Sequence, residues 1–304
     1  MDRAVRIIGA PTDYGANRRG VDMGPSAIRY AGLSNAIESA GASCVDGGDL
    51  STPIMEQRSE PSSSPINANH LTAVREVAGQ VSEEVAEALA TDELPVVLGG
   101  DHSIAVGSLS GSGRDADIGA LWIDAHGDFN TPETSPSGNV HGMALAAALG
   151  NGYFSSVDWA PAAGLREENV VLLGLRDLDA DERTAIRESD VTAYTMSDLD
   201  ARGLRDVIEE ALDVASAGVA GIHVSLDLDW LDPHEAPGVG TPVRGGVSYR
   251  EAHAALEAIA EHDRRYDILR SMDVVEVNPI LDQRNQTADM AVGLVASALG
   301  KRIL

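Results

Sequence analysis

Three short segments of the sequence concentrate the residue types that bind metal ions. They are Gly99–Ser103 (GGDHS), Asp124–Asp128 (DAHGD) and Asp227–Asp229 (DLD). Each one follows a short apolar run, so each is expected where a β-strand ends. Side chains two residues apart on a strand share a face. The acids and the histidine of the second segment are therefore expected to point the same way, as are the two aspartates of the third.

Together these segments offer four carboxylates and two imidazoles to one site: His102, Asp124, His126, Asp128, Asp227 and Asp229. Without a cation, convergent carboxylates repel and raise one another's pKa, and a divalent metal removes that cost. Six ligands exceed the needs of one tetrahedral zinc and suit two ions about 3.5–4 Å apart. Oxygen-rich ligation with some imidazole favours manganese over zinc or copper.

Each segment taken alone has a plainer interpretation. The D-x-D pair could be a solvated turn or a helix cap, DAHGD could be a turn, and His102 could be a core histidine. Their joint occurrence at three apolar strand ends favours the metal site.

The elements that must position these segments alternate between strands and helices. Near-continuous apolar runs predict strands buried on both faces, as in a parallel sheet, and amphipathic stretches predict the helices between them. This alternation indicates an open α/β sheet with helices on both faces and ligands at the carboxyl ends of its strands. Neither a linker nor a repeat is visible, so residues 1–304 are expected to form one domain, with a surface loop at Ser51–Ala68. The expected strands lie within 5–11, 94–100, 118–128, 169–179, 221–230 and 269–279, and helices within 69–90, 204–218 and 249–263.

Composition excludes several classes of protein. The 304 residues are 43% hydrophobic, enough for a large core, and no apolar run reaches the roughly 18 residues of a membrane span. A single cysteine and the absence of a signal-peptide pattern fit a cytoplasmic protein. The formal net charge of −26 argues against nucleic acid as a partner.

That charge has two interpretations. One is an acidic interaction surface or nucleic-acid mimic. The other is adaptation to concentrated salt, which screens self-repulsion while carboxylates maintain solubility. The acids are spread along the chain and form no tail, so the sequence favours a halophilic protein.

The metal motifs resemble those of the ureohydrolase family, which includes the arginases and agmatinases. The similarity runs from IIGAP and RRGVDMGPSAIRYAG near the start to VEVNPILD near the end. Further strings resemble the arginase branch of bacterial and archaeal type: SPSGNVHG at 135–142, GLRDLD at 174–179, GVGTPV at 238–243 and GGVSYRE at 245–251. The resemblance implies a three-layer αβα fold around a central parallel sheet.

The resemblance also implies a reaction, the hydrolysis of the guanidinium of L-arginine to L-ornithine and urea at two Mn²⁺ ions per subunit. His102 and Asp128 would bind one ion, and His126 and Asp229 the other. Asp124 and Asp227 would bridge the pair, together with a water or hydroxide. Binding to a metal lowers the pKa of water toward about 7, so hydroxide would be available at neutral pH.

Two further residues resemble the family's catalytic groups. Glu276 follows the strand MDVVEV, and a carboxylate there could hold a planar guanidinium in a bidentate pair. His141 resembles the family's proton shuttle, and a histidine can protonate a departing amine. The plainer alternatives are an acid paired with a surface arginine and a loop histidine that caps a helix.

The far end of the ligand distinguishes arginine from its decarboxylated form. Asn130, Ser137 and Asn139 resemble the arginase residues that face the α-carboxylate, and Asp179 resembles the one that faces the α-ammonium. Glu182 and Thr241 match further positions near the pocket. Ser, Gly and Asn in a loop are also common turn residues, which is the alternative interpretation of this stretch.

One residue departs from the family pattern. Trp230 follows the D-x-D pair where the family's arginases usually have Gly, and its side chain could enter either the pocket or the core. The alternative functions are agmatinase or another guanidino-acid amidinohydrolase, a non-catalytic metal-stabilised relative, and a dimetal phosphoesterase. The family resemblance also implies a homo-oligomer, a trimer or a hexamer. No nucleotide-binding glycine motif is present.

Overall fold

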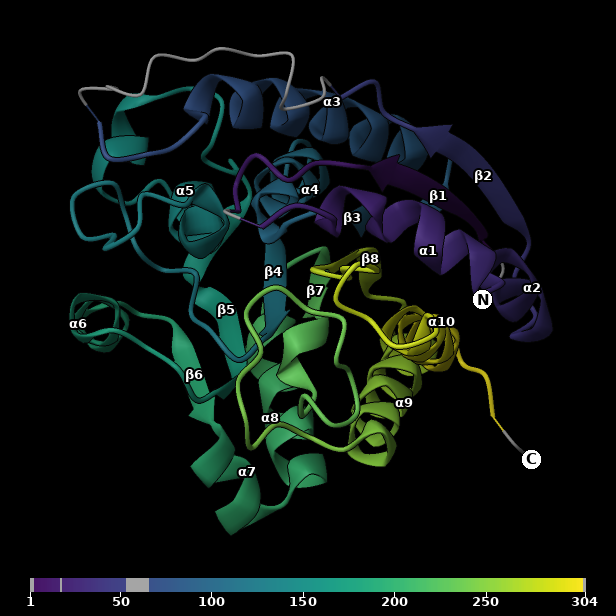
Figure 1. Ribbon diagram of the computed structural model, residues 1–304. Coiled ribbons are helices and arrows are strands. Elements are labelled where there is room, and N and C mark those ends of the chain that lie inside the picture. The colour runs from purple at the N-terminus through teal and green to yellow at the C-terminus, as the bar shows by residue number, and fades with distance from the viewer. Residues whose placement is uncertain (1–2, 17, 53–65, 303–304) are drawn as a thin grey trace.

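A sheet of parallel strands forms the centre of the computed structural model, which describes residues 3–16, 18–52 and 66–302 (Figure 1). Its eight strands follow the order β2-β1-β3-β8-β7-β4-β5-β6. Most of the expected surface loop at Ser51–Ala68 lies outside the described residues. The strands are β1 (Ala4–Ala10), β2 (Cys44–Asp49), β3 (Glu93–Gly99), β4 (Ile118–Ile123), β5 (Leu165–Leu175), β6 (Thr192–Thr195), β7 (Gly221–Asp227) and β8 (Leu269–Val275).

The six strands expected from apolar runs are all present, and the two that the sequence analysis missed form the edges of the sheet. In the central strands β4 and β7 every residue is buried, because helices cover both faces. The edge strand β2 reads CVDGGD and is exposed from its second residue onward, and β6 has only four residues. Edge strands are short and polar because such sequences resist pairing with another chain, and this removes the apolar signal that marks a buried strand.

Helices pack on both faces of the sheet and confirm the three-layer αβα class. The expected helices correspond to α3, α8 and α9. One core lies between the sheet and α1, α2, α7, α8, α9 and α10, and the other cores lie on the opposite side under α3, α4, α5 and α6. The helices are α1 (Gly24–Tyr30), α2 (Leu33–Ser39), α3 (Leu71–Ala90), α4 (Ala105–Ser112), α5 (Ala144–Leu149), α6 (Ala180–Glu188), α7 (Met196–Arg202), α8 (Leu204–Ala215), α9 (Tyr249–Tyr266) and α10 (Gln286–Ala298).

Short 3-10 turns join several of these elements. They are η1 (Val21–Met23), η3 (His102–Ile104), η4 (Val140–Met143), η5 (Gly152–Ser156) and η6 (Leu228–Trp230). Within the described part of the chain, no helix combines the length and the apolar character needed to cross a bilayer.

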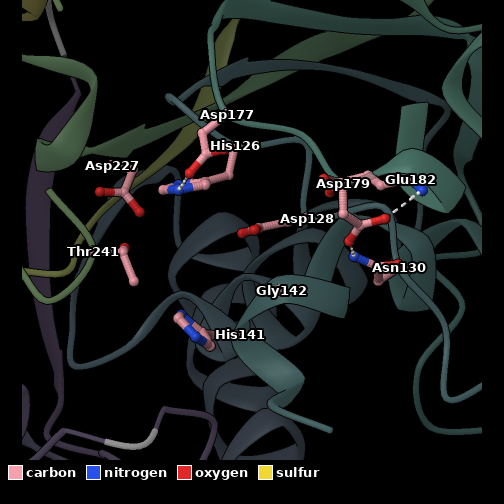
Figure 2. Close-up of a pocket in the computed structure, with 10 residues that line it drawn as sticks. All are labelled: His126, Asp128, Asn130, His141, Gly142, Asp177, Asp179, Glu182, Asp227 and Thr241. Carbon is pink, nitrogen blue, oxygen red and sulfur yellow. Dashed lines mark hydrogen bonds and ion pairs between the residues drawn. The ribbon is translucent and has the colours of Figure 1, made fainter. Parts of the chain in front are cut away.

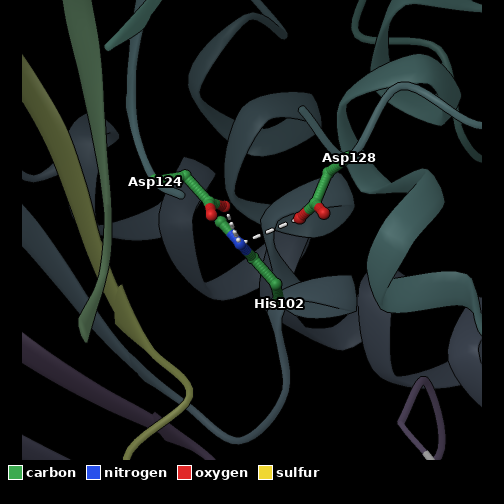
Figure 3. Close-up of side chains that lie close together, drawn as sticks. All are labelled: His102, Asp124 and Asp128. Atoms are coloured by element: carbon green, nitrogen blue, oxygen red, sulfur yellow. Dashed lines mark ion pairs between the residues drawn. The ribbon is translucent and has the colours of Figure 1, made fainter. Parts of the chain in front are cut away.

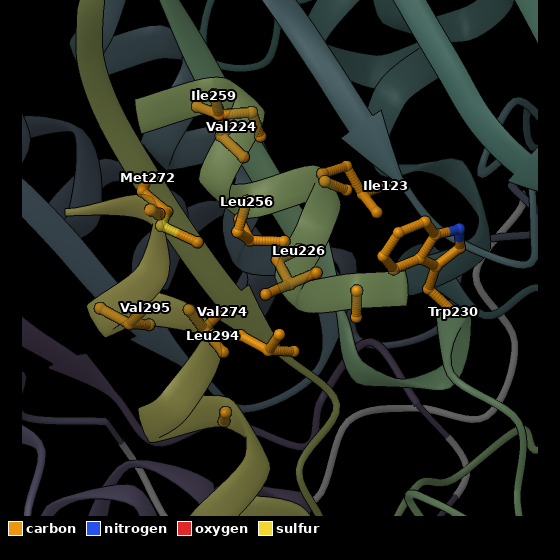
Figure 4. Close-up of a cluster of buried hydrophobic side chains, with 14 of the residues drawn as sticks. Ile123, Val224, Leu226, Trp230, Leu256, Ile259, Met272, Val274, Leu294 and Val295 are labelled. Atoms are coloured by element: carbon orange, nitrogen blue, oxygen red, sulfur yellow. The ribbon is translucent and has the colours of Figure 1, made fainter. Parts of the chain in front are cut away.

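Trp230 points into the core and away from the pocket. Its side chain is fully buried and packs in the same hydrophobic cluster as Ile123 (Figure 4). The indole lies against Gly174, where an added Cβ would come within 2.0 Å of Trp230 Nε1. Gly174 also has a φ of 100°, which disfavours any other residue. The indole is therefore accommodated by a glycine near the end of strand β5.

This close approach predicts a large cost for a single methyl group. Gly174→Ala should lower the free energy of unfolding by about 2–4 kcal/mol, because it overpacks the indole and forces a side chain into the left-handed region. Gly218→Ala is the matched control, since Gly218 has a φ of 72° but no atom within 4 Å of its added Cβ. It should cost only about 1 kcal/mol. Equal losses in denaturant titrations of the two variants would show that the indole imposes no constraint on Gly174.

Candidate metal centre and adjoining pocket

The six candidate metal ligands come together at the carboxyl ends of three central strands. His102 follows β3 in the turn η3, and Asp124–Asp128 follow β4. Asp227 is the last residue of β7, and Asp229 lies in η6. In the sheet, only β8 separates β3 from β7, and β7 pairs directly with β4. The arrangement fits the rule that open α/β sheets bind ligands at this edge.

The ligand side chains converge because tight turns follow the strand ends. The expectation that alternation along a strand would align them is therefore wrong. β4 ends at Ile123, and Asp124 Oδ1 then accepts a hydrogen bond from the backbone N–H of His126 at 2.7 Å. In the same way, Asp227 Oδ1 accepts from the N–H of Asp229 at 2.8 Å. Each of these aspartates stabilises its own turn with one oxygen, and its other oxygen points to the site.

Around His102 the donor atoms are close enough to share one cation. Its Nδ1 lies 3.1 Å from Asp124 Oδ2 and 3.0 Å from Asp128 Oδ2 (Figure 3). It also lies 3.2 Å from Asp227 Oδ2. Despite these short distances, Nδ1 is buried and has no hydrogen-bond partner of acceptable geometry. A lone pair facing three carboxylate oxygens is the donor set of a hard divalent cation, so these residues fit a metal ion.

A second donor group adjoins the first and shares one residue with it. His126 Nδ1 lies 3.0 Å from Asp229 Oδ2 and 3.4 Å from Asp124 Oδ1. Asp124 belongs both to this group and to the group with His102 and Asp128. One carboxylate shared by two groups is the geometry expected where an aspartate bridges two cations. Asp227 belongs to neither of these two groups, although its Oδ2 faces His102.

Burial and mutual repulsion dominate the electrostatics of the cluster. Burial raises the pKa of Asp128 and of Asp227, and the charges of neighbouring aspartates raise both further. Burial alone would lower the pKa of His102 and of His126, but the surrounding carboxylates raise both above the ordinary value. The site therefore attracts positive charge, whether protons or a metal ion.

An acidic pocket opens beside this cluster (Figure 2). Its volume is about 230 Å³, and two of its lining residues, Asp177 and Gly142, were not among the candidates. Asp177 is two-thirds exposed and lies 3.9 Å from His126 Nε2. It stands in the GLRDLD string beside Asp179, which is the signal that could have identified it. The candidates that line this pocket are His126, Asp128, Asn130, His141, Asp179, Glu182, Asp227 and Thr241.

Hydrogen bonds hold the pocket wall, which is formed by Asn130, Asp179 and Glu182. Asp179 Oδ1 caps helix α6 by accepting from the N–H of Glu182 at 2.9 Å, and its Oδ2 accepts from Asn130 Nδ2 at 2.8 Å (Figure 2). Glu182 is buried, which raises its pKa to about 8, and it accepts from the backbone N–H of Phe129. Thr241 Oγ1 donates to Asp229 Oδ2 at 3.0 Å, so it touches a candidate ligand.

A second, smaller cavity of about 190 Å³ shares His141 and Thr241 with the first. Asn139 and Glu276 line it. Ser137 lines neither of these two cavities. Its side chain is exposed and accepts a hydrogen bond from the backbone N–H of Asn139. Ser137 thus lies outside the lining of these two cavities, and its hydroxyl stabilises the loop that carries Asn139.

The two candidate catalytic residues form a pair. Glu276 Oε1 lies 3.1 Å from His141 Nδ1 and accepts from the backbone N–H of His102 at 2.9 Å. Burial would lower the pKa of His141, but Glu276 raises it to about 9. Glu276 is buried at a φ of 66°, so the alternative of a surface ion pair with arginine is wrong. A cationic histidine is the form that can donate a proton.

The whole chain is similar to bacterial arginases. A sequence model described as the Arginase family matches residues 3–300. The arginase of Bacillus subtilis (strain 168) is 49% identical over 310 residues, and that of Brevibacillus brevis 45% over 308, each alignment covering 100% of both chains. The native structure of the arginase from Bacillus caldovelox has a TM-score of 0.92 at 44% identity, covering 99% of this chain and 100% of that one.

The parallel α/β fold carries a His/Asp cluster able to bind metal, and its similarity to arginases makes the chain a hydrolase. With the similarity over its full length, the chain belongs to the arginase family. The family, the fold class and the enzyme class expected from the sequence are thereby confirmed.

The crowding of carboxylates predicts opposite effects of one substitution with and without metal. Asp128→Asn should raise the free energy of unfolding of the metal-free protein by about 1 kcal/mol, because it removes one like charge from the cluster. Asparagine also tolerates the φ of 47° at this position. With Mn²⁺ present, the variant should gain much less stability than the parent, since a ligand is lost.

Thermal melts in chelator and in Mn²⁺ measure both effects. Asp177→Asn is the control, because that carboxylate is largely exposed and should change either value by less than about 0.5 kcal/mol. A variant at Asp128 that melts below the parent in chelator would contradict this account of the repulsion.

Proposed function

We propose that this chain hydrolyses L-arginine to L-ornithine and urea at two Mn²⁺ ions. The observation that carries the proposal is the position of Asp124, which two donor groups share at the edge of an acidic pocket. The full-length similarity to bacterial arginases supports the same reaction.

In this proposal each donor group holds one ion. His102 and Asp128 would hold the first, and His126 and Asp229 the second, with Asp124 and Asp227 between them. Two bound ions would supply hydroxide at neutral pH by lowering the pKa of water. Asp227 is assigned as a bridge because its Oδ2 faces the first group and its Oδ1 holds the turn of Asp229.

Glu276 and His141 are the proposed catalytic pair. The buried carboxylate of Glu276 would bind the planar guanidinium and orient its carbon toward the ions. His141 would donate the proton that the departing amine of ornithine needs. Its raised pKa keeps it protonated at neutral pH, which suits that role.

The pocket wall would bind the far end of arginine. Asp179 is proposed to accept from the α-ammonium, and Asn130, Asn139 and Ser137 are proposed to face the α-carboxylate. Glu182 and Thr241 would hold the wall and the metal turn in place. Agmatine and other guanidino acids remain the second candidate substrates, because Ser137 lines neither cavity and Asn130 already donates to Asp179.

We further propose a single-domain, cytoplasmic protein that forms a trimer or hexamer and is adapted to concentrated salt. The net charge of −26 supports the salt adaptation. At about 1 M salt the Debye length, the distance over which charges repel one another, falls to about 3 Å. Greater stability in dilute buffer than in molar KCl would contradict this part of the proposal.

Urea release from three guanidino compounds tests the proposed reaction. The protein is loaded with Mn²⁺ in molar KCl and assayed with L-arginine, agmatine and 4-guanidinobutyrate. Arginine should be preferred by at least about 100-fold in kcat/KM, because only arginine offers both α-substituents to the pocket wall. Asp179→Asn should reduce the preference for arginine over agmatine and 4-guanidinobutyrate, because it raises the KM for arginine. A preference for agmatine in the parent would retain the metal site and overturn the pocket assignment.

A further inference from the structure

Four buried polar side chains lie behind His102, on the side of its ring away from the carboxylates. Ser225 and His223 come from β7, and Asp273 and Ser271 from the neighbouring strand β8. The register pairs Ser225 with Asp273 and His223 with Ser271. All four side chains are completely buried. We call them the β7–β8 network, and none of them is a candidate metal ligand.

Hydrogen bonds connect this network directly to His102. His102 Nε2 lies 2.7 Å from Ser225 Oγ, and that hydroxyl donates to Asp273 Oδ1 at 2.6 Å. The other oxygen, Asp273 Oδ2, lies 3.1 Å from His223 Nε2. His223 Nδ1 in turn lies 2.8 Å from Ser271 Oγ. The network therefore touches the metal centre at one atom, His102 Nε2.

The direction of these bonds fixes the tautomer of His102. A serine hydroxyl has one proton, and Ser225 gives that proton to Asp273. Ser225 Oγ must then accept from His102, so Nε2 carries the proton. In a neutral imidazole with a proton on Nε2, the lone pair belongs to Nδ1. Nδ1 is the atom that faces the aspartates of the cluster.

The ionised state of Asp273 is what gives the network its direction. Burial would raise the pKa of Asp273, but the charge and hydrogen bond of His223 hold it below the usual range. An ionised carboxylate can only accept hydrogen bonds, so Ser225 must donate its hydroxyl proton to Asp273 and cannot accept one from it. An amide at position 273 could donate to Ser225 and reverse the order of donors.

Ring stacking holds the plane of His102, independently of the network. Trp122 stacks on the imidazole with a centroid distance of 4.1 Å and an interplanar angle of 7°. Stacking restricts the ring to a plane but does not select which nitrogen carries the proton. That selection falls to Ser225 and Asp273.

We propose that Ser225 and Asp273, supported by His223, are positioning residues that keep the Nδ1 lone pair of His102 directed at the metal. The inference rests on the metal site of the proposed function. Outer hydrogen bonds to metal-binding histidines typically contribute about 10–100-fold to affinity. The network thus tunes metal affinity and touches neither substrate nor reacting atoms.

Calorimetric titration of the metal-depleted protein with Mn²⁺ tests this role without any assay of activity. Ser225→Ala and Asp273→Asn should each weaken one Mn²⁺ equivalent by about 10–100-fold and leave the other within about threefold. Ser225→Thr keeps the hydroxyl and should retain most of the affinity.

Ser108→Ala is the matched control, because its hydroxyl is fully buried in α4 and has no partner. It should bind both equivalents like the parent. Histidine-labelled ¹⁵N spectra of the metal-free protein, recorded above the raised pKa of His102 so that its imidazole is neutral, provide a second readout. His102 should carry its proton on Nε2 in the parent and lose that preference in Asp273→Asn.

Two results would overturn the proposal: parental Mn²⁺ affinity in both Ser225→Ala and Asp273→Asn, or an equal loss in Ser108→Ala. If Asp273→Asn fails to fold, the comparison of Ser225→Ala with Ser225→Thr decides. A parent that binds Mn²⁺ but releases no urea would overturn the proposed function alone. A parent that binds no Mn²⁺ would overturn both.

Discussion

Repulsion between buried carboxylates is the constraint on which the rest of this structure depends. Four aspartates lie at the carboxyl ends of the strands, and three of them are within 3.2 Å of His102 Nδ1. Two like charges about 4 Å apart cost about 4 kcal/mol at an effective dielectric constant of 20. Such a cluster is unfavourable unless a cation compensates it, and the surrounding protein must hold the acids together against that repulsion.

Buried central strands, and the contacts that fix two strained residues beside them, provide this restraint. The ligands lie at or after the ends of β3, β4 and β7, which are buried between helices except for the half-buried Glu93. Asp128 and Glu276 adopt φ angles of 47° and 66°, a region that costs of order 1–3 kcal/mol outside glycine. Both residues are fixed by contacts with the His102 segment: Asp128 with its ring and Glu276 with its backbone N–H. These contacts hold each strained residue in the orientation that the site requires.

Sequence could predict the parts of this molecule that rest on burial or on local motifs. Apolar runs identified the six central strands. Acids and histidines directly after three of these runs identified the ligand segments. Edge strands β2 and β6 gave no such signal, because a strand covered on one side carries polar residues.

The orientation of Trp230 could not be predicted from sequence, since it depends on the space that Gly174 leaves on a segment more than 50 residues away. The sequence also could not predict that Ser137 lies outside the two cavities, because loop geometry decides which polar side chains of a loop line a cavity. The β7–β8 network could have been noticed as polar residues at alternate positions in two apolar strands, but the pairing register is what joins them.

Anomalous X-ray diffraction at the manganese edge, from crystals grown with Mn²⁺, tests the central claim most directly. The account predicts two manganese peaks in each chain, one beside His102 and Asp128 and one beside His126 and Asp229. Asp124 should contact both peaks. A single peak, or two peaks that do not share Asp124, would contradict the claim that this carboxylate cluster is built around a pair of ions.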